Sequence, residues 1–429
     1  MNRFRIKLVH LLITTLLLGL FASAAAQERT RIVYLSAGSA EVEQRHDQKW
    51  VDEFNRSQDR IHVEYELVAW ADLFTKLYAY LAAGDAPDVV WYAPTQINEW
   101  HKMGILEPLD EWLGDTKDTY LPHLLSDGSD VVFGGNMYGA PFTQAARAWV
   151  IRRDWLEEAG IDPEGIRTWD DFRDAAAAMT NPDEGRYALS FAFAEDRIPT
   201  GAIHWYFGPG FGLNAVDDFR DEKRDAYIAM LDYIQSLAPY MPPAQAAWTH
   251  RDTIISYVNG TVGMAMQGSF FQGDLAPLAP ELADPAVSLI LANPAPADSG
   301  RDPSIAAYTV GYVMMNASRN KEEAAEFIQF MTRSSALREW PMNVAPRVDI
   351  TIDDRVEVLG EGVRWWEEAW QDLFSGRDAE LVAMVPYTPA GEINAITTAV
   401  LSDLLSGSLT AEQAYDRLRS QIERVQAQN

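Results

Sequence analysis

Residues Ala82 to Tyr92 read Ala-Ala-Gly-Asp-Ala-Pro-Asp-Val-Val-Trp-Tyr, and this stretch decides the fold class that the sequence predicts. The apolar residues before it are spaced along one face of a helix over 73–81. Gly84 can adopt the left-handed conformation just past that helix, and Pro87 prevents the helix from restarting. We therefore expect a helix that ends sharply before a new element.

Val89 and Val90 predict a short buried strand, which places Trp91 and Tyr92 at its carboxyl end. Ligands of open α/β sheets bind outside the carboxyl ends of the strands. The two rings are therefore candidates for a binding site, although packing in a core explains them equally well.

The segments around this stretch also alternate between predicted strands and predicted helices. Residues 31–36 and 61–68 read as strands, and a helix through Trp50 and Phe54 lies between them. The resulting β-α-β-α-β order predicts a parallel sheet flanked by helices. Further along, Thr168, Asn320 and Thr410 each stand three residues before an acid or an amide, which predicts three capped helix starts.

The first 26 residues have the features of a secretory leader. Three basic residues precede an apolar run over 11–21, and three alanines follow over 24–26. We expect cleavage after Ala26 and export to a periplasm, with an uncleaved N-terminal anchor as the alternative. The chain has no cysteine, which argues against a lipoprotein anchor and against disulfides. The mature chain of about 400 residues is longer than one hydrophobic core usually serves, so two lobes are expected.

Charge and motifs narrow the function classes. The formal net charge of −28 disfavours nucleic acid and anionic membranes as partners. No HExxH pair, phosphate-binding loop or dinucleotide fingerprint occurs, and Gly268-Ser269-Phe270 lacks the pattern of a nucleophile elbow. We therefore expect no catalytic residue, no metal and no cofactor. Carboxylates are abundant, so a glycosidase-like acid pair stays open as an alternative.

Aromatic residues are numerous, with 14 Trp, 17 Tyr and 17 Phe. Flat rings stack on the apolar CH faces of sugars, whose hydroxyls need directed donors and acceptors. Core packing is the alternative for each ring. The aromatic candidates near predicted loops are Trp70, Trp91, Tyr92, Phe142, Trp205, Tyr206, Phe270 and Tyr308.

The order of several segments resembles the family 1 extracellular solute-binding proteins of ABC importers, the maltose-binding-protein-like group, over essentially the whole mature chain. The segments that carry the resemblance are 50–55, 61–64, 70–73, 82–90, 104–110, 137–142, 160–172, 259–265, 268–270 and 322–328.

The resemblance implies a two-lobed, type II periplasmic-binding-protein fold, each lobe a mainly parallel sheet flanked by helices, with a hinge and a ligand between the lobes. The N-terminal lobe would comprise 27–142 and 293–340, and the C-terminal lobe 143–292 and 341–429. Crossings between the lobes would fall near 143–147, 288–292 and 341–347.

The resemblance also suggests ligand contacts. The loop after the first strand offers Ser36, Gly38 and Glu41, and Trp70, Trp91 and Tyr92 follow the next two strands. Gly268-Ser269-Phe270 resembles the family's Gly-Ser-Trp segment, with Phe in place of Trp. Tyr308 lies where relatives often carry glycine, which would narrow the site. Arg347 could donate to hydroxyls or be an ordinary surface charge.

The implied function is capture of a mono- or small oligosaccharide and its delivery to the membrane permease subunits of an ABC transporter, by a monomer. A phosphate ligand would need clustered cations, and a polyamine would need carboxylates beside the rings. A glycerophosphodiester or polyamine ligand on the same fold stays open, as does a secreted carbohydrate-active enzyme.

Overall fold

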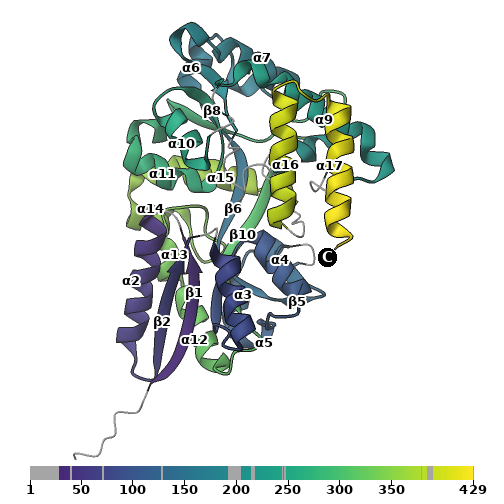
Figure 1. The fold of residues 1–429 in the computed structure, drawn as a ribbon. Coiled ribbons are helices and arrows are strands. Elements are labelled where there is room, and N and C mark those ends of the chain that lie inside the picture. Colours follow the sequence, from purple (N-terminus) through teal and green to yellow (C-terminus); the bar gives the residue numbers. More distant parts are fainter. Residues whose placement is uncertain are drawn as a thin grey trace, which may run out of the picture.

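A computed structural model describes residues 29–38, 41–69, 72–126, 129–191, 204–213, 218–243, 245, 248–377, 379–383 and 390–428. The expected leader lies outside these residues. Two lobes lie one above the other in Figure 1, and long strands run between them.

The first lobe begins with the predicted alternation. Strands β1 (Thr30–Ala37), β2 (Ile61–Val68) and β3 (Val89–Tyr92) alternate with helices α2 (Glu41–Ser57) and α3 (Leu73–Ala83). Strand β1 pairs in parallel with both β2 and β3, which confirms the predicted parallel arrangement of these strands. Gly84 ends α3 in the left-handed conformation, with φ of 70°, as the sequence predicts.

Two long antiparallel strands join the lobes, β6 (Gly139–Arg152) and β10 (Ser304–Met314). They connect β3 to β8 (Val262–Gly268) and β7 (Tyr187–Leu189), so that one sheet runs in the order β2-β1-β3-β10-β6-β8-β7. The chain therefore has the expected α/β architecture. The sheet is mixed, however, because β10 and β6 each pair antiparallel with their neighbours along this path.

The return to the first lobe is made by β10, whereas the sequence places a crossing at 288–292. Strand β9 (Ser288–Leu291) instead pairs with the last residues of β6, from Trp149 to Arg152. Asn293 and Ser304 then exchange two backbone hydrogen bonds and close a hairpin between β9 and β10. Ile305 and Ala306 pack in the cores of the second lobe, so residues 293–306 lie with that lobe. We therefore give the boundaries between the lobes as a proposal.

Helices and short strands complete the two lobes (Figure 1). The first lobe also holds α4 (Pro94–Lys102), α5 (Asp110–Leu113), β4 (Val132–Phe133), β5 (Asn136–Met137), α12 (Lys321–Met331) and α13 (Ser334–Arg338). The second holds α6 (Arg153–Glu158), α7 (Trp169–Met179), α9 (Arg224–Ser236), α10 (His250–Val258), α11 (Gln272–Leu278), α14 (Ile352–Leu359), α15 (Arg364–Phe374), β11 (Glu380–Ala383), α16 (Ala390–Leu405) and α17 (Ala411–Gln426).

The helix starts test the capping predictions. Thr168 and Thr410 each form a complete capping box with the residue three positions on. The prediction for Asn320 is wrong, because its side chain makes no cap hydrogen bond. That amide donates instead to the backbone oxygen of Arg31 and to the carboxylate of Asp88, both at 3.3 Å.

Candidate functional site

Arg147 lies in the middle of β6, where the sheet passes from one lobe to the other. Its guanidinium carbon lies 4.7 Å from the ring centre of Phe270 and 5.6 Å from that of Tyr308. Only 6% of Arg147 is exposed, and its Nε has no hydrogen-bond partner. A buried cation thus contacts two aromatic rings at the junction of the lobes.

Strand pairing brings these three residues together. Arg147 is opposite Gly268 on β8, and Tyr308 is opposite Ala145, two residues before Arg147 on β6. Residues opposite each other, or two apart, share one face of a sheet. A Cβ at Gly268 would lie 2.5 Å from the backbone oxygen of Ala146 and 2.7 Å from the Phe270 ring. Glycine therefore permits the close turn that returns Phe270 to Arg147.

Two tyrosine hydroxyls act on the guanidinium. Burial acts to lower the pKa of Arg147, and the hydroxyls of Tyr308 and Tyr206 more than offset that effect. Burial raises the pKa of Tyr308, which Arg147 opposes. The arginine therefore stays charged and the tyrosine stays neutral at physiological pH.

Acceptors from the first lobe lie near the same tyrosine. The Asp130 carboxylate accepts hydrogen bonds from the backbone nitrogen of Thr309 at 2.5 Å and from its hydroxyl at 3.0 Å. Burial raises the pKa of Asp130 to about 6. The charges of Asp130 and Glu43 also raise the pKa of Tyr308, so both carboxylates act on it electrostatically. The junction thus offers rings, one cation and hydrogen-bond acceptors, which we call the junction site: Glu43, Asp130, Arg147, Phe270, Tyr308 and Thr309.

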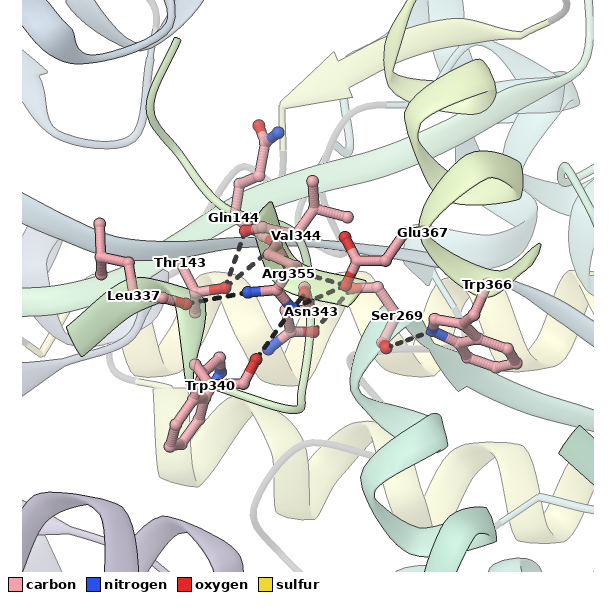
Figure 2. Close-up of polar contacts among 10 residues, drawn as sticks. All are labelled: Thr143, Gln144, Ser269, Leu337, Trp340, Asn343, Val344, Arg355, Trp366 and Glu367. Carbon is pink, nitrogen blue, oxygen red and sulfur yellow. Dashed lines mark hydrogen bonds and ion pairs between the residues drawn. The ribbon is translucent and has the colours of Figure 1, made fainter. Parts of the chain in front are cut away.

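A segment after α13 fixes Ser269, the residue that precedes Phe270 in the sequence (Figure 2). The Ser269 hydroxyl donates to Asn343 Oδ1 at 2.6 Å and accepts from the Ala146 nitrogen at 3.2 Å. The backbone oxygen of Ser269 accepts from Trp366 Nε1 at 2.9 Å. Ser269 is fully buried, so its polar atoms serve the protein itself.

The same segment, which the sequence analysis proposes as a crossing at 341–347, lies beside β6. Val344 exchanges two backbone hydrogen bonds with Gln144, and its oxygen also accepts from the Thr143 hydroxyl at 3.0 Å. Buried Arg355 donates to three backbone oxygens of the segment and to Glu367. Figure 2 shows Arg355 at the centre of its contacts with Leu337, Trp340, Asn343 and Glu367.

Of the ligand contacts that the sequence suggests, the structure brings Phe270 and Tyr308 together at Arg147 and holds Gly268 and Ser269 beside them. Six others lie inside hydrophobic or hydrogen-bonded cores, which is the alternative that the sequence left open for the aromatic ones. These are Ser36, Trp91, Tyr92 and Phe142 in the first lobe and Trp205 and Tyr206 in the second.

The buried contacts of these residues are specific. Ser36 donates to Asp47 at 2.7 Å, and the Tyr92 hydroxyl is 2.8 Å from that of Thr309. The Trp91 ring packs on Tyr312 and Phe142. Tyr206 is the exception among them, because its hydroxyl also faces Arg147.

The remaining suggested contacts fall elsewhere. Arg347 makes two hydrogen bonds of 2.8 Å to Asp349 and a third to the backbone oxygen of Thr332, which hold it within the first lobe. Gly38 donates its backbone nitrogen to Val68. Glu41 begins α2, and its side chain lies outside the description, as does the whole of Trp70.

The sequence did not single out Arg147, Asp130, Glu43 or Thr309. One signal was available for the first of these. Arg147 is the one charged residue within Gly139–Val150, a run that is buried throughout. A cation in such a run requires local compensation, which marks it as a candidate site residue.

Neither a spanning helix nor a metal cluster is found in the part of the chain that the structure describes. No helix there is long and apolar enough to cross a bilayer. Nor do three or more His, Asp or Glu side chains gather there closely enough to hold a metal ion.

Comparison with known proteins places the chain among binding proteins. Residues 40–337 match the family described as bacterial extracellular solute-binding protein. A putative binding protein of Brucella abortus is 25% identical over 288 residues, which are 65% of this chain and 66% of that protein. An arabinooligosaccharide-binding protein of Halalkalibacterium halodurans is 23% identical over 67% of this chain and 66% of its own length. The matches thus span just under two thirds of these relatives.

A solved structure resembles nearly the whole chain. An ABC transporter solute-binding protein of Thermotoga lettingae, bound with α-D-tagatose, aligns with a TM-score of 0.72 at 19% identity. The alignment covers 92% of this chain and 99% of that protein. This likeness confirms the two-lobed α/β fold that the sequence resemblance implied.

Proposed function

The chain belongs to the family of bacterial extracellular solute-binding proteins, and on that premise we propose that it captures a carbohydrate at the junction site for an ABC importer. The observation that carries the proposal is the pair of rings, Phe270 and Tyr308, that both contact Arg147 at the junction of the lobes. Sugar CH faces stack on such rings, and sugar hydroxyls take directed hydrogen bonds.

The two lobes contribute different parts of the junction site. Glu43 comes from α2 of the first lobe, whereas Phe270 comes from the turn after β8 in the second. Arg147, Tyr308 and Thr309 lie on the strands that join the lobes. A ligand that contacts all of them stabilises the arrangement in which the lobes are closed, because only that arrangement supplies every contact.

Names of the relatives support a sugar as the ligand class. The Halalkalibacterium halodurans relative is named for arabinooligosaccharides, and the Thermotoga lettingae protein was solved with a ketose. We further propose that this chain acts without catalysis, as a periplasmic monomer released by cleavage after Ala26, and passes its ligand to membrane permease subunits.

Thermal shift and calorimetry with the protein from residue 27 onward test the sugar-binding proposal. We expect at least one neutral or acidic mono- or oligosaccharide to bind stoichiometrically without being converted, and to raise the melting temperature by mass action. The Phe270→Ala variant should bind that sugar at least tenfold more weakly, because a stacking ring is lost.

Phe330→Ala is the matched control, because Phe330 is also half-buried and also stacked with an arginine, Arg333, but at α12. Its affinity should equal that of the wild type. Equal affinity in Phe270→Ala would remove the ring from the site, and turnover of glycosides would favour an enzyme instead.

A further inference from the structure

Arg147 carries a positive charge for which the described part of the chain supplies no negative partner. Of the residues that the structure describes, none forms an ion pair with it, and no carboxylate is among the main influences on its pKa. Arg355, which is also buried among the described residues, pairs directly with Glu367 at 2.6 Å. Arg355 therefore has a carboxylate of the protein as its counter-charge, whereas Arg147 has none among the described residues.

The neighbours of Arg147 compensate its charge only in part. The rings of Phe270 and Tyr308 offer cation–π contact, and the Tyr308 and Tyr206 hydroxyls are neutral. The Nε hydrogen has no acceptor. A buried guanidinium without a counter-charge is unfavourable, and a ligand that supplies the charge removes that cost on binding.

The shape of the group suggests which anion it takes. A guanidinium presents parallel N–H donors that match the two oxygens of a carboxylate. A phosphate carries up to two negative charges, and Arg147 is the one described cation that contacts both rings, while Asp130 and Glu43 near Tyr308 would repel the second charge. Those two carboxylates suit sugar hydroxyls instead.

Building on the proposed function, we propose that the ligand is an acidic sugar, a uronate or uronate-containing oligosaccharide, whose carboxylate pairs with Arg147 while its ring packs on Phe270 and Tyr308. The first lobe then contacts the sugar hydroxyls through the carboxylate of Asp130, which Thr309 holds in place. Under this proposal Arg147 determines specificity, since it distinguishes an acidic sugar from the neutral sugar of the same shape.

Calorimetry with matched triples tests the proposal. Each triple is a uronate, its uncharged methyl ester and the parent neutral sugar, taken from the gluco, galacto and manno series as monomers and short oligomers. We expect one uronate to bind the wild type at least tenfold more tightly than its ester and its neutral parent, and a sugar phosphate to bind more weakly than the uronate.

Arginine variants assign the preference. Arg147→Gln keeps a donor but no charge, so the ratio of uronate to ester affinity should fall to about one, whereas Arg147→Lys should keep part of the preference. Arg333→Gln, at the matched arginine–ring contact of α12, should keep all of it. Melting of each variant without ligand shows that it is folded.

The possible outcomes separate the two proposals. A neutral sugar that binds the wild type as tightly as its uronate, or a preference for the acid that survives in Arg147→Gln, would overturn the acidic-sugar inference and leave sugar binding standing. Absence of binding to every member of all triples would overturn both. Should Arg147→Gln fail to fold, the comparison of acid with ester in the wild type decides.

Discussion

Trp91 and Phe270 are both large aromatic residues near ends of strands, and their surroundings give them different roles. Only 4% of Trp91 is exposed, and its ring packs 5.1 Å from that of Tyr312 and 5.6 Å from that of Phe142. Phe270 is half-buried and contacts a charged group. At the scale of the residue, burial decides whether a ring stabilises the fold or is available to a ligand.

Replacing Trp91 should therefore destabilise the protein. We expect Trp91→Ala to lower the free energy of unfolding by roughly 3–5 kcal/mol, because it removes a large buried side chain and leaves a cavity. Phe270→Ala should cost less than Trp91→Ala in the same urea titrations. Loss of sugar affinity in Trp91→Ala with unchanged unfolding free energy would instead place that ring in the site.

Asp130 should make stability depend on pH. Burial raises the pKa of this carboxyl from 3.8 to about 6, so the folded state binds the proton more tightly than the unfolded state. The ionised group therefore destabilises the folded state to its full extent above about pH 6, and this destabilisation decreases as the pH falls toward 4. Relative to Asp130→Asn, the wild type should gain up to about 3 kcal/mol of stability between pH 7 and pH 4.

Urea titrations across this pH range measure the effect of Asp130. Asp225→Asn, which removes a fully exposed carboxylate of α9, is the control variant. Parallel pH profiles for Asp130→Asn and the wild type would contradict the assignment.

Among the helices, the same short capping pattern forms a cap at some helix starts and not at others, depending on the residues nearby. Threonine three residues before an acid or amide begins α7, α10, α14 and α17, each with a complete capping box. Asn320 has the same spacing before α12 but turns its amide toward β1 and Asp88. The local pattern therefore predicts a cap, but the side chain does not form it when groups of a neighbouring strand offer other hydrogen-bond acceptors.

Thr410→Ala should lower the free energy of unfolding by about 1 kcal/mol, because the Gln413 nitrogen loses the hydroxyl acceptor that lies 3.3 Å away. Thr410→Ser keeps that acceptor and should be close to the wild type. Differential scanning calorimetry of the two variants gives the comparison, and equal melting of Thr410→Ala and the wild type would show that the cap contributes nothing.

Across the whole molecule, a buried ion pair fixes the segment between α13 and α14 that lies beside β6. Arg355 holds the backbone oxygens of Leu337, Trp340 and Asn343 as well as Glu367 (Figure 2). Asn343 has a positive φ of 65°, a conformation that few residues other than glycine adopt. The ion pair thus maintains an unusual turn that, through Ser269, also positions the chain beside Phe270.

A double-mutant cycle tests this ion pair. Arg355→Met should cost roughly 3–5 kcal/mol, because it leaves Glu367 buried without its partner. The double variant Arg355→Met/Glu367→Met should be less destabilised than the sum of the two single variants, since it removes both charges together. Additive costs in urea unfolding would show that the two side chains act independently.

The local elements and the family could be predicted from the order and spacing of residues along the chain. The helix over 73–81, its stop at Gly84, the parallel strands around it and two of the three predicted caps follow from spacing and from backbone preferences within a few residues. The order of such segments along the chain was enough for the family and for the two-lobed fold.

Which candidate residues come into contact could not be predicted from local patterns. Arg147, Phe270 and Tyr308 are far apart in the sequence, and strand pairing alone makes them neighbours. The return crossing at β10 rather than at 288–292 likewise depends on the pairing of β9 with the end of β6. Burial and charge compensation arise from contacts between distant residues, so no local pattern could separate the core rings from those of the junction site.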